Sequence, residues 1–243
     1  MDFLSFVKSL NYRSIHTVGS KNKLKRFREN ETFSNVIQPT REEVLQGFKY
    51  KGNWASHFGN DHPLVLELGC GKGEYTLGLA RREPDKNYVG VDIKGARFWR
   101  GAKTALEDKL PNVAFLRSQI ELVDLLFGEG EVDEIWITFP DPQIKYRRTK
   151  HRLTNPAFLE RYRRILKKDG IIHLKTDSEY LHGYTLGLLQ GLGHKVLYAN
   201  HDVYRNTGSP AEVLELRTFY ENQYLEIGKP ITYIQFCFGP TGL

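Results

Sequence analysis

Short runs of branched and aromatic residues alternate with amphipathic stretches from residue 64 onward. Apolar runs bounded by turn residues predict buried strands, and apolar positions at a helical period predict helices. We expect helices at 74–82, 95–109, 156–168, 179–191 and 212–225. We expect strands at 64–68, 88–91, 113–116, 134–139, 171–176, 195–199 and 232–238.

This alternation indicates the fold class. A strand followed by a helix and a second strand normally forms a parallel pair through a right-handed crossover. We therefore predict an α/β fold with one doubly wound, mostly parallel sheet of seven strands. Only one helical stretch separates the last two strands, which leaves open an antiparallel pair at the edge of this sheet.

The first sixty residues lack the alternation. Six Lys or Arg and no Asp or Glu occur between Arg13 and Arg28, and a short helix is expected at 40–49. We interpret residues 1–60 as a basic N-terminal extension that is partly flexible, and residues 61–243 as the main domain. A basic tail without a specific role is the alternative for the extension.

Composition narrows the class of protein. The chain has 243 residues, 40% hydrophobic and 12% aromatic, which predicts a folded domain with a real core. Its formal charge of +6 would suit a polyanionic partner, although ordinary solvated cations explain it equally well. Cys70 and Cys237 cannot build a zinc site by themselves, so we expect no metal and a reducing compartment. No run of 18 apolar residues occurs, so we expect a cytoplasmic protein without a membrane span.

A glycine-rich turn follows the first strand of the main domain. Gly69, Gly71 and Gly73 occupy alternate positions before a predicted helix. In a doubly wound sheet such a turn binds ligands, because glycine permits tight turns and close approach. Asp92 ends the next strand, where a carboxylate accepts hydrogen bonds from both hydroxyls of a ribose. Gln119 follows the third strand and could read the edge of an adenine.

The charge of this turn distinguishes between ligands. Glu74 stands where a dinucleotide-binding fingerprint has its third glycine. Glu67 precedes the first glycine, and its carboxylate would repel a pyrophosphate but attract a ligand with an ammonium and a sulfonium. That is the charge pattern of S-adenosylmethionine, and Glu67-x-Gly69-x-Gly71-x-Gly73 resembles the first motif of class I methyltransferases. A nicotinamide enzyme and a purely structural turn are the alternatives.

The fourth strand ends in an acidic turn, Pro140-Asp141-Pro142. The two prolines restrict the backbone on both sides of Asp141. In a sheet of this topology the carboxylate would lie beside the donor methyl group. Methyl transfer moves positive charge onto a purine, and N7 already has a free lone pair, so alignment and charge stabilisation suffice. We predict that Asp141 is catalytic and also borders the cofactor; a rigid turn without chemistry is the alternative.

A basic run follows this turn. Residues 145–152 contain five Lys or Arg and no carboxylate, and Tyr146 could stack on a base. If about five phosphates are contacted, log affinity should fall with log salt at a slope of roughly −3.5 to −4.5. Further cations on the helix at 156–168 would extend the surface, whereas a plain solvated surface is the alternative. The predicted RNA-binding residues are Arg147, Arg148, Thr149, Lys150, His151 and Arg152.

Four motifs in this order resemble the bacterial tRNA (guanine-N7-)-methyltransferase family. They are Glu-Leu-Gly-Cys-Gly-Lys-Gly at 67–73, Phe-Pro-Asp-Pro-x-x-Lys-x-Arg at 139–147, His-Leu-Lys-Thr-Asp at 173–177 and Arg-Thr-Phe-Tyr-Glu at 217–221. The resemblance covers about residues 62–238 and implies a Rossmann-like class I methyltransferase fold. It also implies methylation of N7 of the guanine at position 46, in the variable loop of tRNA.

The resemblance implies roles for matching residues. S-Adenosylmethionine would be bound by Glu67, Asp92, Gln119 and Asp141. Glu221 can accept hydrogen bonds from N1 and N2 of guanine, which leaves N7 free to attack. The substrate nucleotide would be contacted by Lys145, Asp177, Thr218, Phe219, Tyr220 and Glu221.

The sequence departs from the family at three positions. Gln143 replaces a frequent Trp, Arg148 replaces a usual His, and Asp92 replaces the commoner Glu. An inactive RNA-binding protein on the same scaffold and a methyltransferase for another RNA position are the alternative functions. Intact Glu67, Asp92 and Asp141 argue against loss of activity. The sequence leaves open whether the protein is a monomer or a homodimer.

Overall fold

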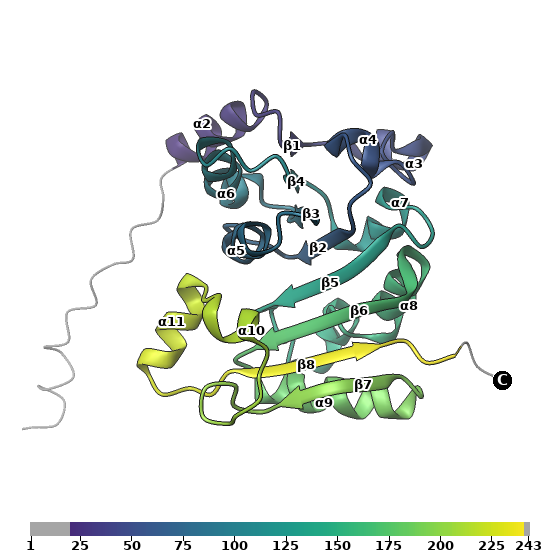
Figure 1. Ribbon diagram of the computed structural model, residues 1–243, viewed down its shortest axis with the longest axis vertical. Coiled ribbons are helices and arrows are strands. Elements are labelled where there is room, and N and C mark those ends of the chain that lie inside the picture. The colour runs from purple at the N-terminus through teal and green to yellow at the C-terminus, as the bar shows by residue number, and fades with distance from the viewer. Residues whose placement is uncertain (1–19, 241–243) are drawn as a thin grey trace, which may run out of the picture.

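The computed structural model describes residues 20–240, which fold around one sheet of eight strands (Figure 1). The described strands are β1 (Val36–Ile37), β2 (Leu64–Leu68), β3 (Asn87–Val91), β4 (Val113–Leu116), β5 (Val132–Thr138), β6 (Leu166–Thr176), β7 (Lys195–Asn200) and β8 (Thr232–Cys237).

The sheet order is β1-β4-β3-β2-β5-β6-β8-β7. All neighbours from β1 to β6 are parallel, and β8 pairs antiparallel with both β6 and β7. The predicted α/β class and the mostly parallel, doubly wound sheet are therefore confirmed. The predicted strand number of seven was one short, because the two-residue strand β1 adds to the edge beside β4.

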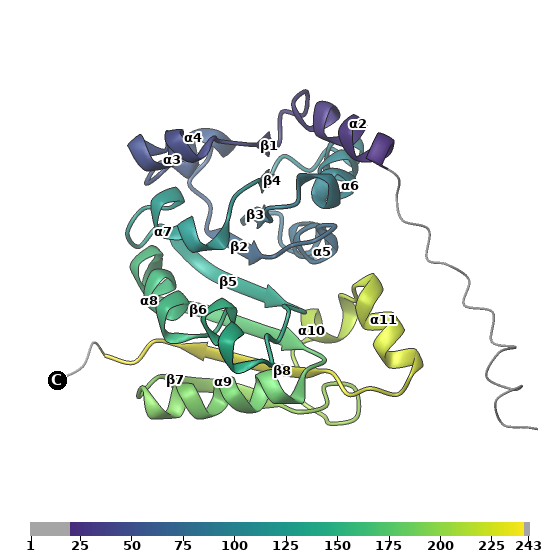
Figure 2. The same cartoon turned by 180° about the vertical axis from the view of Figure 1, so that it is seen from behind.

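Helices cover both faces of the sheet (Figures 1 and 2). Side chains from α5, α6 and α10 pack on one face, whereas those from α3, α4, α7, α8 and α9 pack on the other. The described helices are α2 (Ser20–Asn30), α3 (Arg41–Gly47), α4 (Trp54–Phe58), α5 (Glu74–Arg82), α6 (Gly95–Glu107), α7 (Val123–Leu126), α8 (Pro156–Ile165), α9 (Glu179–Gly191), α10 (Ala211–Glu215) and α11 (Phe219–Glu226), with 3-10 turns η1 (Ile120–Leu122) and η2 (Tyr146–His151).

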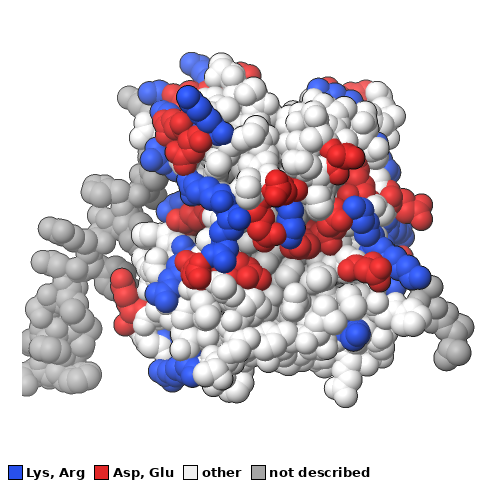
Figure 3. Space-filling model, in the orientation of Figure 1, with Lys and Arg blue, Asp and Glu red and all other residues white. Residues whose placement is uncertain are grey.

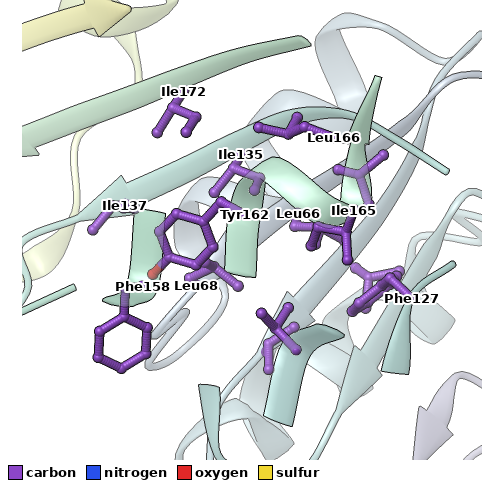
Figure 4. Packing of buried hydrophobic residues seen from close by; sticks show 14 of the residues in the cluster. Leu66, Leu68, Phe127, Ile135, Ile137, Phe158, Tyr162, Ile165, Leu166 and Ile172 are labelled. Atoms are coloured by element: carbon purple, nitrogen blue, oxygen red, sulfur yellow. The ribbon is translucent and has the colours of Figure 1, made fainter. Parts of the chain in front are cut away.

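The core follows the two-residue period of the strands. Leu66 and Leu68 face the side of the sheet that α8 covers, together with Ile135 and Ile137 of β5 (Figure 4). Trp136, which lies between these two isoleucines, faces the opposite side. Because both faces of the central strands are buried, their sequences are almost continuously apolar.

Two predicted helices need correction. The helix expected at 156–168 ends at Ile165, because Leu166 begins β6 and pairs with Val132. The helix expected at 212–225 is two helices, α10 and α11, which are separated at 216–218. Thr218 has extended backbone angles and accepts a hydrogen bond as the N-cap of α11, so it cannot continue α10.

The described part of the first sixty residues packs on the main domain. Strand β1 pairs with β4, and α3 lies within the expected 40–49. Trp54 is 1% exposed and its ring stacks on Phe127 with 5.0 Å between centroids. Residues 1–19, which include Arg13, lie outside the described part of the chain. Between residues 20 and 240, no helix is long and apolar enough to cross a membrane, and no cluster of three metal-ligating side chains occurs.

Candidate functional site

The glycine-rich turn connects β2 to α5 at the carboxyl edge of the parallel strands. Gly69, Gly71 and Gly73 all have positive φ angles, of 80°, 56° and 74°, which side-chain-bearing residues rarely adopt. A Cβ on Gly73 would lie 2.5 Å from the ring of Phe115, so this glycine also permits close packing. No atom lies within 4 Å of a Cβ built on Gly69. The turn is thus a backbone cradle that is open to a ligand.

Glu67 lies beneath this cradle and is 4% exposed. Its carboxylate accepts hydrogen bonds from the backbone N–H and the hydroxyl of Thr76, and from the hydroxyl of Thr138 at 2.7 Å. Burial raises the pKa of Glu67 to about 7, although these three hydrogen bonds oppose the shift. The carboxylate therefore joins β2, α5 and β5, and a nearby cation would favour its charged form.

Asp92 ties the turn to the start of α6. Its Oδ2 accepts from the Gly71 backbone N–H at 3.0 Å, and its Oδ1 accepts from that of Lys94 at 2.7 Å. Each oxygen keeps a second lone pair, which suits two ribose hydroxyls. The sequence-based position of this carboxylate, at the end of β3 beside the cradle, agrees with the structure.

A cavity of about 320 Å³ lies beside Asp92, beyond β4. Ile93, which is 49% exposed, Ser118 and Gln119 line one part of it. Arg41 at the start of α3 lines another part and donates to Gln119 Oε1 at 3.3 Å. An apolar wall with an amide at its rim suits a flat heterocycle such as adenine. With the cradle and Asp92, these residues fit an adenosyl group.

Asp141 is exposed at the end of β5, next to β2 in the sheet. Its Oδ1 accepts from the Gln143 backbone N–H at 3.0 Å. Phe139 and Gln143, on either side, have φ angles of 47° and 48°, which are unfavourable for residues with a side chain. Backbone strain of this kind concentrates at functional sites. The turn holds the carboxylate in solvent on the same edge as the cradle.

Most of the basic run is exposed. Lys145 and the side chains of Arg147, Arg148, Lys150 and His151 have no ion-pair partner among residues 20–240. They lie on or just before η2, the turn that follows Asp141. Thr149, also in this turn, is partly exposed and donates its hydroxyl to the backbone of Tyr146.

Arg152 differs from the rest of the run. It is 4% exposed, donates to the carbonyl of Gln143 at 3.1 Å and to the Tyr180 hydroxyl at 2.7 Å, and lies over the ring of Tyr184. In this position it holds the loop after Asp141 against α9. Its expected contact with RNA stays a prediction, which would require these contacts to open.

Three of the cations expected to extend the basic run are ion-paired. Arg161 and Arg164 form ion pairs with Asp124, and Lys167, at the start of β6, pairs with Asp133. Paired cations attract phosphate less, because a carboxylate already neutralises them.

Asp177, just after β6, forms an ion pair with Lys229 and is partly buried. The N-cap of α9 is Ser178, whose hydroxyl accepts from Leu181 N, so Asp177 is not needed as a cap. Its carboxylate lies at the carboxyl edge of the sheet, two strands from the cradle.

The motif at 217–221 forms the start of α11. Thr218 and Glu221 make a capping box, in which each side chain accepts from the other residue's backbone N–H. Glu221 is 0% exposed, and its Oε1 accepts from Lys175 Nζ and the Tyr204 hydroxyl, both at 2.6 Å. The implied contact of Glu221 with guanine therefore stays a prediction that requires this ion pair to open.

Phe219 and Tyr220 are about half exposed. The Phe219 backbone N–H donates to Glu74 Oε2 at 3.2 Å, and Lys72 Nζ lies 4.1 Å from the centroid of its ring. The Phe219 ring therefore borders the glycine turn, with the Tyr220 ring 5.7 Å from it, and stacking on a base is available there.

Lys175 was not expected from the sequence. It is fully buried, and burial lowers its pKa to about 8, against the opposing effect of Glu221. Its Nζ also donates to the carbonyls of Val213 at 2.6 Å and Leu216 at 3.1 Å. A lysine within the predicted apolar strand 171–176 indicates that a buried hydrogen-bond acceptor lies near it. The sequence does not show which residue provides that acceptor.

Comparison with known proteins agrees with this geometry. Residues 61–234 match a family described as putative methyltransferase. A tRNA (guanine-N(7)-)-methyltransferase of Christiangramia forsetii is 70% identical over 221 residues, which cover 90% of this chain and 99% of that protein. The protein of the same name from Porphyromonas gingivalis is 50% identical, with 86% of each chain covered.

Solved structures share the fold. The 16S rRNA methyltransferase KamB superposes with a TM-score of 0.60 at 16% identity, covering 77% of this chain and 93% of that one. A SAM-dependent methyltransferase from Aquifex aeolicus gives a TM-score of 0.51 at 17% identity, with 89% and 98% covered.

Proposed function

The chain belongs to the tRNA (guanine-N(7)-)-methyltransferase family, and from this premise we propose that Asp141 is its catalytic residue and guanine 46 of the variable loop its target. The protein is an enzyme that transfers a methyl group from S-adenosylmethionine to N7 of a guanine in tRNA. One arrangement supports the assignment most strongly: Asp92, Glu67 and Asp141 lie at the carboxyl ends of the adjacent strands β3, β2 and β5, in that order.

The three carboxylates have separate tasks in this proposal. When bound, S-adenosylmethionine supplies an electrophilic methyl group. Asp92 holds the ribose hydroxyls, and Glu67 carries the negative charge that faces the cationic end. Asp141, exposed and fixed by its turn, accepts hydrogen bonds from guanine and offsets the positive charge that develops on the purine. Since N7 carries no proton, no general base is needed.

Methylation can be located directly. The protein is incubated with labelled S-adenosylmethionine and an unmodified tRNA transcript, and borohydride and aniline then cleave the RNA at any N7-methylguanosine. We expect one cut at position 46. A cut elsewhere would correct the target, and incorporation of label without cleavage would show that N7 is not the acceptor.

The exposed cations of η2 are expected to bind phosphates of the tRNA. Replacing Arg147, Arg148 and Lys150 together with Ala should raise KM for tRNA and flatten its salt dependence, because each lost phosphate contact removes roughly 0.7–0.9 from the slope. The expected change is about 2–3 units in a plot of log Kd against log salt. Replacing Arg161, Arg164 and Lys167, which are ion-paired, removes the same charge and should change the slope less. Equal slopes for the wild type and the η2 variant would assign the run to ordinary surface.

The pKa of Glu67 predicts that cofactor binding depends on pH. With a pKa of about 7, most of the carboxyl is protonated at pH 5.5, and the bound ammonium favours the ionised form. Affinity for S-adenosylhomocysteine should therefore rise as pH increases from 5.5 to 7, by up to roughly 15-fold, with release of a proton on binding. Calorimetry in buffers of different ionisation enthalpy measures both. Glu67→Gln should remove the dependence, and an unchanged pH profile in that variant would mean that another group titrates.

A further inference from the structure

Exposed cations of this protein fall into two kinds when they are sorted by their partners. Arg81 and Arg82, in the last turn of α5, form ion pairs with Asp108 and Glu215. Three other exposed cations, Lys94, Arg97 and Arg100, have no carboxylate, carbonyl or aromatic partner for their side chains among residues 20–240. We call Lys94, Arg97 and Arg100 the α6 ridge. Unpaired cations in one place attract a polyanion more than paired ones.

Helix packing explains why the ridge faces solvent. Phe98, Ala102 and Ala105 point into the core, and Trp99 is covered by Arg26 of α2, whose guanidinium lies 4.8 Å from the ring. Arg97 and Arg100 are three residues apart, so they lie side by side on the remaining face of α6. In the view of Figure 3, Lys and Arg gather over the region of α2 and α6, with some carboxylates among them.

The sheet order places the ridge and η2 on opposite sides of the cofactor cradle. Helix α6 follows β3, η2 follows β5, and β2 with its glycine turn lies between these two strands. All three lie at the carboxyl edge of the parallel strands. The ridge begins two residues after Asp92, which places positive charge on the adenosyl side, and η2 places it on the Asp141 side.

We propose that the α6 ridge is a second phosphate-binding surface for tRNA, so that the RNA backbone is held on both sides of the methyl-transfer site. This inference rests on the proposed function, because tRNA is the polyanion involved. The N-terminal end of α6 adds partial positive charge from its helix dipole. Phosphate contacts on both sides orient an RNA without reading its sequence.

The test compares two double variants with the same loss of charge. Arg97→Ala/Arg100→Ala removes two ridge cations, whereas Arg81→Ala/Arg82→Ala removes two ion-paired cations from neighbouring α5. Lys94 is left intact, because its backbone N–H contacts Asp92. Binding of an unmodified tRNA transcript is measured between 0.05 and 0.5 M salt, and binding of S-adenosylhomocysteine is measured by calorimetry.

For the ridge variant we expect tRNA binding about 25- to 60-fold weaker at 0.1 M salt, with the slope lowered by roughly 1.4–1.8. The α5 variant should lower the slope by less than half as much as the ridge variant does. Both variants should bind S-adenosylhomocysteine as the wild type does. An unchanged slope in the ridge variant, or an equal drop in both variants, would overturn the inference. If the wild type and the variants bind tRNA with the expected slopes but the wild type leaves N7 unmethylated, the proposed function is wrong. The inference that the α6 ridge binds phosphates would still hold.

Discussion

Replacing Asp141 with alanine is expected to lower kcat for tRNA methylation by about 10²- to 10³-fold, while the affinity for S-adenosylhomocysteine changes little. Losing one group that stabilises developing charge costs this much in other enzymes. The carboxylate is exposed and makes no ion pair among the described residues, so its removal should leave the fold intact. Single-turnover methylation with saturating tRNA measures the chemical step, and calorimetry measures cofactor binding.

Asp141→Asn separates charge from shape. Asparagine can still accept from the Gln143 backbone N–H and so preserve the turn, but it lacks the negative charge. If charge stabilisation is the main role, Asn and Ala variants should be similarly slow. A matched control is Asp85→Ala, an exposed aspartate that also follows a proline but lies between α5 and β3. Full activity of Asp141→Asn would leave only the turn as the role of this residue.

The central strands could be predicted from the sequence because strands that are buried on both faces are apolar at nearly every position. The strands expected at 64–68 and 113–116 coincide with β2 and β4, and every residue of both is buried. The glycine turn and Asp92 were predictable for a similar reason. Strand ends define the binding edge of such a sheet, and glycine at alternate positions signals an unusual backbone.

Residues whose role depends on distant contacts were not predictable in the same way. Trp54 is buried because Phe127 lies against its ring and the Leu126 carbonyl accepts from its indole N–H at 3.1 Å. Nothing near position 54 in the sequence indicates those partners. Arg152 ends a run of exposed cations, yet its side chain is buried because its guanidinium lies over the rings of Tyr180 and Tyr184 on α9. The sequence does not distinguish Arg152 from the other cations of the run, because charge alone does not indicate the direction in which a side chain points.

Glu221 illustrates the same difficulty for the substrate site. A glutamate near an exposed Phe219 and Tyr220 resembles a surface residue, but the capping box turns its side chain back toward the helix start. There it meets Lys175 from β6, more than forty positions earlier in the chain. Lys175 links the two helices, because its Nζ binds the carbonyls of Val213 and Leu216 at the end of α10 and the Glu221 carboxylate of α11.

Lys175→Met is therefore expected to destabilise the protein by about 3–5 kcal/mol, which corresponds to a fall in Tm of roughly 6–20 °C. Methionine fills a similar volume, but the variant leaves the Glu221 carboxylate without its cation at a position with no exposure. Urea denaturation followed by circular dichroism measures the free energy of unfolding. Lys229→Met is the matched control, because it breaks a lysine–aspartate pair at the same strand end, where the lysine is 40% exposed, and should cost less than about 1 kcal/mol.

The double variant Lys175→Met/Glu221→Gln tests whether the lost stability comes from the uncompensated charge. A neutral amide can still accept from the Tyr204 hydroxyl and from the Thr218 backbone N–H, as Glu221 does. We expect it to recover at least half of the loss seen in Lys175→Met, since the two substitutions act on one interaction and their effects are not additive. If the double variant is less stable than either single variant, or if Lys175→Met costs no more than Lys229→Met, the ion pair does not hold α10 and α11 on the sheet. Opening this ion pair for the implied contact of Glu221 with guanine would then cost little free energy.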